Sequence, residues 1–159
     1  VDFSYEVSRS LAACEGAILL VDSAQGVEAQ TVSHAYLAME NDLNLIPVLN
    51  KIDLSTSQVD ESAEQLMDLI GCKRDEIYNI SAKTGKGAAE LLAAIVDKID
   101  SPASTGSEAP RALVFDSTFD SFRGAIPYVR VFDGTLETGM TAQFMSTERI
   151  HEITEVTAR

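Results

Sequence analysis

Short apolar runs alternate with helix-like segments along the first hundred residues, and this alternation sets narrow limits on the fold. The apolar runs are too short to be helices and lie at residues 17–22, 45–50 and 77–80. Segments with apolar residues at helical spacing lie at about 2–14, 28–41, 57–70 and 87–99. Strands that alternate with helices form βαβ units with right-handed crossovers. The sequence therefore predicts an α/β fold for residues 1–100, with a parallel sheet and flanking helices.

A stretch rich in proline, glycine and serine at residues 101–110 is typical of a linker. Beyond it the apolar period changes from helical spacing to alternation. Runs that read as strands lie at residues 112–115, 125–132, 141–145 and 150–157. Asp133-Gly134 and Gly139 mark turns between them. Residues 111–159 are therefore expected to form an antiparallel sheet or part of a β-barrel.

Composition excludes several classes of protein. The chain has 159 residues, 45% of them apolar, so it can bury the core of one domain or two small ones. No apolar run approaches the eighteen residues of a membrane-spanning helix, and nothing at Val1 resembles a signal peptide. Cys14 and Cys72 fit reduced cytosolic thiols, and His34 and His151 stand isolated, so no metal site is expected.

The negative charge of the chain argues against a protein whose whole surface binds nucleic acid. Residues 1–100 carry 7 basic and 17 acidic residues (net −10), and residues 101–159 carry 5 and 8 (net −3). All five basic residues of the second part are arginines, which suit phosphate contacts. Two roles are open to the aromatic residues Phe119, Phe122 and Tyr128: they could stack on RNA bases or pack in the core of a barrel. Packing in a barrel core is favoured.

Polarity appears abruptly where the second apolar run ends, in Asn50-Lys51-Ile52-Asp53. Ligands of open α/β sheets bind beyond the carboxyl ends of the strands. The Asp53 carboxylate can accept two parallel hydrogen bonds, and guanine offers two adjacent donors, its N1–H and its 2-amino group, whereas adenine does not. Lys51 can lay its methylene stem over the base while its ammonium stays in water. Asn50 can tie neighbouring loops together.

A second polar segment, Ser81-Ala82-Lys83, follows the third apolar run and precedes a helix. The Ser81 hydroxyl can brace the loop, the Ala82 N–H can meet the guanine carbonyl, and Lys83 can cover the other face of the base. With the first segment it resembles the base-recognition half of a regulatory GTPase. The alternative is that this turn only caps the following helix.

Three local signals favour structural interpretations. Asp22 ends the first strand, where a magnesium ligand or a turn cap would fit, and the cap is favoured. Ser57-x-x-Asp60 predicts a capping box at the start of the helix at 57–70. Gly85-Lys86-Gly87 hints at a phosphate loop, but the pattern G-x-x-x-x-G-K-S/T occurs nowhere in the chain.

Longer matches connect the chain with a family. They are VDFSYEVSRSL at 1–11, DSAQGVEAQT at 22–31, NKID at 50–53, FDS at 115–117, YVRV at 128–131 and DGTL at 133–136. Together they resemble the LepA (elongation factor 4) family of bacterial translational GTPases over essentially the whole chain. Ile52 stands where the sibling elongation factor G usually has methionine.

This resemblance implies a factor that binds GTP and GDP, uses Mg²⁺ in the intact protein and hydrolyses GTP on the ribosome. It implies ribosomal RNA and tRNA as partners, with an effect on tRNA translocation state or ribosome function. It further implies a cytoplasmic protein that associates peripherally with the cytoplasmic face of the membrane. By position, the nucleotide-binding residues are Asn50, Lys51, Ile52, Asp53, Ser81, Ala82 and Lys83. Residues 1–14 correspond to the second switch helix, and residues 111–159 to the start of the β-barrel second domain.

Departures from the family pattern are equally informative. The phosphate loop, the first switch and the Asp-x-x-Gly-His segment lie upstream of Val1 in the family, and they do most of the positioning in phosphoryl transfer. We therefore expect an internal fragment with no catalytic and no metal-binding residue, which does not hydrolyse GTP and binds guanine nucleotides weakly. An apolar strand at 17–22 without its neighbour favours self-association. Two alternatives remain: another GTPase of the elongation factor G type, and a non-catalytic protein- or RNA-interaction module.

Overall fold

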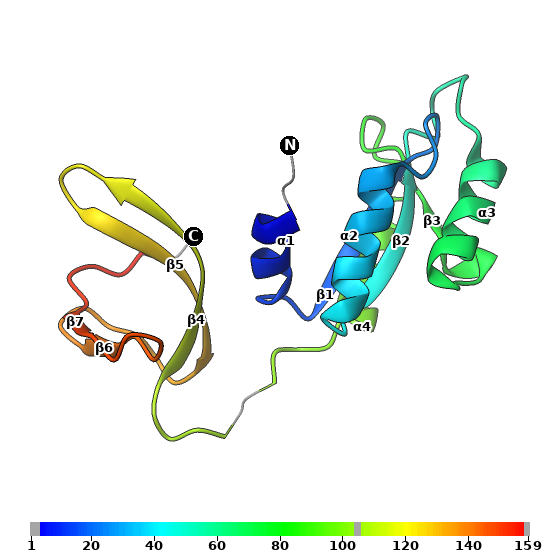
Figure 1. Ribbon diagram of the computed structural model, residues 1–159. Coiled ribbons are helices and arrows are strands. Elements are labelled where there is room, and N and C mark those ends of the chain that lie inside the picture. The colour runs from blue at the N-terminus through cyan, green and yellow to red at the C-terminus, as the bar shows by residue number, and fades with distance from the viewer. Residues whose placement is uncertain (1–3, 104–105, 158–159) are drawn as a thin grey trace. The chain divides into compact units, whose positions relative to one another are not determined.

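Three parallel strands form the sheet of the first half of the chain in a computed structural model, which describes residues 4–103 and 106–157. Strands β1 (Gly16–Asp22), β2 (Asn44–Asn50) and β3 (Tyr78–Asn79) lie side by side in the order β1-β2-β3 (Figure 1). In the pairing of β1 with β2, Asp22 stands opposite Asn50. The chain divides into two compact units, Val1–Ser101 and Pro102–Arg159.

Helices cover both faces of this sheet because β2 carries apolar side chains on both. The covering helices are α2 (Ala29–Glu40) and α3 (Val59–Ile70) on one face and α4 (Ala88–Lys98) on the other, with a 3₁₀ turn at Arg74–Glu76. Helix α1 (Ser4–Leu11) contacts α2. Leu49 packs with residues of α2 and α3, whereas Ile46 and Val48 pack with Leu91 of α4. A strand buried on both faces reads as a continuous apolar run, which explains the sequence of β2. The predicted α/β class is confirmed.

Strand β1 lies at the edge of the sheet. In the described part of the chain it pairs with β2 alone. Leu19 and Val21 are buried, but Ile18 and Leu20, on the opposite face, are 43% and 53% exposed. A groove of about 380 Å³ runs beside these residues and the first turn of α2. This edge therefore combines exposed apolar side chains with a strand that has one unpaired side among the described residues.

The helix expected at 57–70 ends at the predicted residue but does not begin with the predicted cap. Gly71 ends the helix in the left-handed conformation (φ 71°), and its N–H donates to the Met67 carbonyl, as a C-terminal glycine does. The capping box predicted at Ser57 is wrong, because the N-cap is Gln58 and its side chain makes no cap. The Ser57 hydroxyl instead lies 2.7 Å from the Ser23 hydroxyl.

The second unit consists of two antiparallel pairs of strands. A long hairpin joins β4 (Arg111–Asp120) to β5 (Gly124–Asp133), and β6 (Thr141–Gln143) pairs with β7 (Ile150–Glu152). Phe119 and Phe122 are 81% and 96% exposed at the end of the hairpin, so their assignment to a barrel core is wrong. The predicted succession of parallel α/β and antiparallel β structure is nevertheless confirmed.

Candidate functional site

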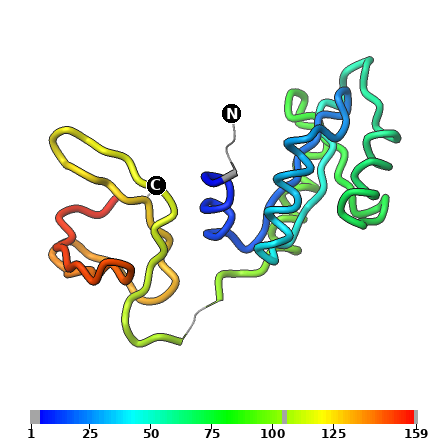
Figure 2. The backbone as a smooth tube through the Cα atoms, in the orientation of Figure 1, coloured from blue at the N-terminus to red at the C-terminus, as the bar shows by residue number. Residues whose placement is uncertain are grey.

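The loops that follow β1, β2 and β3 gather at one end of the first unit, as the trace of the chain shows (Figure 2). All three strands are parallel, so their carboxyl ends meet at one edge of the sheet. This is the edge at which α/β proteins bind ligands. The two polar segments that the sequence singled out, 50–53 and 81–83, both lie there.

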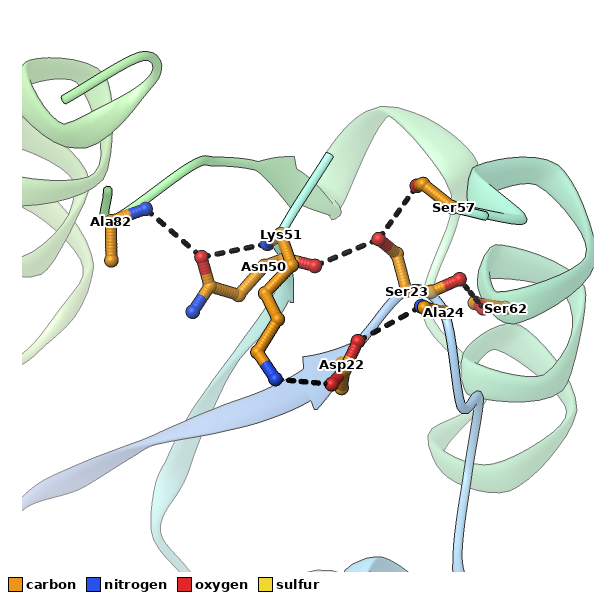
Figure 3. A network of polar contacts seen from close by, with 8 residues as sticks. All are labelled: Asp22, Ser23, Ala24, Asn50, Lys51, Ser57, Ser62 and Ala82. Atoms are coloured by element: carbon orange, nitrogen blue, oxygen red, sulfur yellow. Dashed lines mark hydrogen bonds and ion pairs between the residues drawn. The ribbon is translucent and has the colours of Figure 1, made fainter. Parts of the chain in front are cut away.

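Asn50 joins the two segments. Its side-chain Oδ1 accepts the N–H of Lys51 at 2.8 Å and the N–H of Ala82 at 3.0 Å (Figure 3). The second bond spans 32 residues of sequence and fixes the loop after β3 against the loop after β2. The Ala82 N–H, which the sequence assigned to a guanine carbonyl, thus already has an acceptor within the protein.

Asp53 and Ser81 make the second connection between the loops. The buried Ser81 hydroxyl donates to Asp53 Oδ1 at 2.6 Å and accepts the Thr84 N–H at 3.2 Å. The Ser81 bond lowers the pKa of Asp53, and the charge of Lys83 adds to this. Asp53 is therefore a fixed carboxylate at neutral pH. Each of its oxygens has two lone pairs, so both can accept further hydrogen bonds.

Lys51 forms an ion pair with Asp22 across the ends of β2 and β1. Its Nζ lies 2.6 Å from Asp22 Oδ2, while Asp22 Oδ1 accepts the Ala24 N–H at 2.9 Å (Figure 3). The Lys51 bond is the main reason that the pKa of Asp22 is lowered, and the Ala24 bond adds to it. The favoured interpretation of Asp22 as a turn cap is confirmed. The ion pair was missed, although the register that puts Asp22 opposite Asn50 could have revealed it.

Ser23 is a buried hub beneath these residues. Its hydroxyl contacts the Asn50 carbonyl at 2.8 Å and the Ser57 hydroxyl at 2.7 Å (Figure 3). Its own carbonyl accepts the Gln58 N–H at 2.7 Å and the Ser62 hydroxyl at 3.3 Å. The hub connects the end of β1 with the end of β2 and the start of α3. Sequence reasoning missed it, because a serine after a strand carries no distinguishing pattern.

The remaining predicted site residues contribute less side-chain contact. The Ile52 N–H donates to the Ile80 carbonyl at 3.3 Å, and Lys83 is exposed. Gly87 opens α4 with φ 73°, and a Cβ there would lie 2.4 Å from the Asn79 carbonyl oxygen. That close approach requires glycine. Gly87 therefore has a structural reason that involves no phosphate.

The arrangement places the Asp53 carboxylate, the Lys51 side chain and the exposed Lys83 at the edge of the sheet where α/β proteins bind ligands. Within residues 4–103 and 106–157, no group of three acidic, histidine or cysteine side chains is placed to hold a metal ion. Asp22 fits poorly as a ligand of Mg²⁺, because its two oxygens are engaged by Ala24 and Lys51. No described helix is long and apolar enough to cross a membrane.

Comparisons with known proteins agree with this geometry. The chain belongs to the family described as the elongation factor Tu GTP binding domain, whose profile matches residues 1–101. Within that class it is similar to the proteins named elongation factor 4 from Frankia casuarinae, with 55% identity over 156 residues, and Streptomyces coelicolor, with 54%. The resemblance to the elongation factor 4 family is confirmed, and the alternatives are not favoured.

The matches differ in how much of each protein they cover. The alignments include 98% of this chain but 24% of the Frankia protein and 25% of the Streptomyces protein, so the chain spans about a quarter of their length. A bacterial selenocysteine-specific elongation factor, EF-Sec, has a similar fold, with a TM-score of 0.69 over 91% of this chain and 26% of its own. Its sequence is 22% identical, so this likeness supports the fold alone.

Proposed function

We propose that the loops after β2 and β3 bind the guanine base of GTP or GDP. The observation that carries the proposal is the 2.6 Å bond from Ser81 to Asp53, because it holds a charged carboxylate where the two loops meet. Asn50 holds the same loops together through Ala82. Membership in a GTP-binding family supports this ligand.

Each residue has a distinct role in this proposal. Asp53 accepts the N1–H and 2-amino hydrogens of guanine, and the Ala82 N–H is then divided between Asn50 and the guanine carbonyl. The stems of Lys51 and Lys83 cover the two faces of the base. Ile52 contributes its backbone, which ties the loop to the end of β3. A base without the two adjacent donors leaves the remaining lone pairs of Asp53 without a donor from the ligand, which disfavours adenine.

We propose further that the chain acts as part of a protein that hydrolyses GTP, with Mg²⁺, during translation on the ribosome, as the name of its relatives suggests. Ribosomal RNA and tRNA are the proposed partners, and the cytoplasm and the cytoplasmic face of the membrane the proposed locations. Residues 1–100 would be part of the GTP-binding domain, 101–110 a linker and 111–159 the start of the second, β-barrel domain. The residues of this chain carry no catalytic group in the proposal, and on their own they bind nucleotide weakly without hydrolysing it.

We also propose that the chain self-associates through β1. The exposed side chains of Ile18 and Leu20 and the unpaired edge support this, since an apolar edge strand pairs readily with another chain.

A titration followed by ¹⁵N NMR tests the base site and detects weak binding. Addition of GDP to the labelled chain should shift the amides of Lys51 and Ala82, and ADP at equal concentration should not. Asp53→Asn should weaken GDP binding about 10- to 100-fold, because the 2-amino group loses its acceptor. Xanthine has a carbonyl where guanine has that amino group, so this variant should gain affinity for xanthosine diphosphate. Equal shifts with GDP and ADP, unaltered in Asp53→Asn, would contradict the proposal.

A further inference from the structure

Lys51 has a backbone conformation that calls for an explanation. Its φ is 65°, in the left-handed region that lysine rarely adopts. Local bonds hold the backbone, since the Lys51 N–H donates to Asn50 Oδ1 and the Lys51 carbonyl accepts the Leu54 N–H at 3.1 Å. The consequence is visible in Figure 3, where the side chain leaves the end of β2 and runs to Asp22 at the end of β1.

Asp22 is the rigid member of this pair. Its side chain is 17% exposed, against 53% for Lys51. The Ala24 N–H fixes one carboxylate oxygen, and the next residue, Ser23, is buried and bonded to the Asn50 carbonyl. The other oxygen faces Lys51 Nζ. A long flexible lysine is therefore held at its far end by an anchor that the fold itself keeps in place.

We propose that Asp22 is a positioning residue for nucleotide binding, which holds Lys51 stretched across the ends of β1 and β2 so that its stem forms a ready platform for the base. This inference rests on the proposed guanine site. A free lysine must lose side-chain freedom when a base lies against it, and the tether removes that freedom beforehand. The ammonium keeps a charged partner while the methylene groups face the ligand.

The opposite arrangement is a latch, in which Asp22 draws Lys51 away from the ligand. The two differ in the sign of the effect of one substitution. With a platform, Asp22→Asn weakens GDP binding; with a latch, it strengthens it. The measurement is the GDP titration of the ¹⁵N-labelled chain, followed at the Ala82 amide.

The expected result is a loss of about 2- to 5-fold in GDP affinity in Asp22→Asn, as for one lost ion pair at a partly exposed site. Asp60→Asn is the matched control, because it removes the ion pair between Asp60 and Arg74 (3.3 Å) on the same unit. That variant should bind GDP like the wild type. Unchanged or increased affinity in Asp22→Asn overturns the inference.

A double-mutant cycle separates positioning from a general structural role. Lys51→Met keeps an unbranched stem but removes the ammonium, so Asp22 has nothing to hold. In that background Asp22→Asn should change GDP affinity less than about twofold. An undiminished effect overturns the inference.

A second variant covers the case in which Asp22→Asn fails to fold. Asp22→Glu keeps the charge, and its GDP affinity should lie between that of the wild type and that of Lys51→Met. A GDP affinity at or below that of Lys51→Met overturns the inference.

The same titrations distinguish this inference from the proposed function. Absence of GDP-specific shifts in the wild type overturns both, because there is then no base site. If Asp53→Asn loses GDP binding but Asp22→Asn does not change it, the proposed guanine site is supported and only the positioning role of Asp22 is overturned.

Discussion

The two units of the chain bury their strands to very different degrees. In β2, residues 46–49 are fully buried beneath helices on both faces. Of the described residues of the second unit, only Asp133 is buried, and β5 alternates half-buried with exposed positions. A sheet of two strands with no covering layer is marginal by itself. The comparison shows that the first unit carries its own core and that the candidate site is built on the rigid edge of that core.

The largest expected difference between the units is the response to a truncated core side chain. Leu66 of α3 is fully buried between the sheet and its helices, so Leu66→Ala should lower the free energy of unfolding by about 2–5 kcal/mol. Val129→Ala in β5 should cost less than about 1 kcal/mol, because Val129 is already partly in solvent. Urea unfolding followed by circular dichroism measures both. Equal costs would show that the second unit has a comparable core.

The second largest loss of stability is expected on removal of the buried Ser23 hydroxyl. Ser23→Ala removes the hydroxyl between Asn50 and Ser57 and leaves Ser57 without that partner, at a cost of about 1–3 kcal/mol. Ser33→Ala is the control, since the Ser33 hydroxyl bonds the Ala29 carbonyl on an exposed part of α2 and its loss should be nearly neutral. Faster amide exchange at Gln58 in Ser23→Ala would confirm the hub. The same stability in both variants would contradict it.

Self-association tests the exposed edge of the first unit. A charge on an apolar edge opposes pairing, so Leu20→Lys should convert associated chain to monomer. Leu92→Lys provides the control, because Leu92 is also an exposed leucine but lies on α4. Sedimentation velocity over a range of concentrations measures the change. A wild type that stays monomeric at millimolar concentration speaks against the proposal.

The pKa of Asp22, and with it the loss of stability at low pH, should depend on Lys51. The folded state lowers the pKa of Asp22, so the stability from this group is present above its ordinary pKa of about 3.9 and is lost as the pH falls through the folded value. Lys51→Met should move the pKa of Asp22 back toward that ordinary value. Asp120 in the second unit keeps its lowered pKa in this variant, because the backbone N–H groups of Arg123 and Phe122 cause it. Carboxyl ¹³C titrations compare the two; an unaltered Asp22 in Lys51→Met is the contrary outcome.

The sequence was sufficient to predict that the two candidate segments lie together, because local patterns and one topological rule determine it. The apolar run before Asn50 marks a buried strand, and parallel strands bring their carboxyl ends together, so 50–53 and 81–83 had to lie near each other. The individual bonds depend on distances that the sequence does not encode. The Ala82 N–H bonds Asn50 because the loops approach to 3.0 Å, and the pair of Lys51 with Asp22 follows from register and a positive φ.

The wrong predictions have physical causes of the same kind. The capping box failed because Ser23 takes the Ser57 hydroxyl, a contact across 34 residues. The strand expected at 77–80 is two residues long, since a 3₁₀ turn precedes it and the site loop follows it. Apolar character alone placed Phe119 in a core, but its exposure depends on whether a second layer of structure covers the hairpin. Local propensity cannot supply that information.

The smallest expected effect concerns the exposed end of the hairpin. The turn is held by Asp120, whose Oδ1 accepts the N–H groups of Phe122 and Arg123 at 2.8 and 2.9 Å, and the Phe122 ring takes no part. Phe122→Ala should therefore change stability by no more than about 0.5 kcal/mol, whereas Asp120→Ala should disturb the register of β4 and β5. Thermal unfolding and the hairpin amide shifts measure this contrast. If Phe122→Ala costs as much as Leu66→Ala, the ring is buried in solution, and the difference between the two units is smaller than the structure indicates.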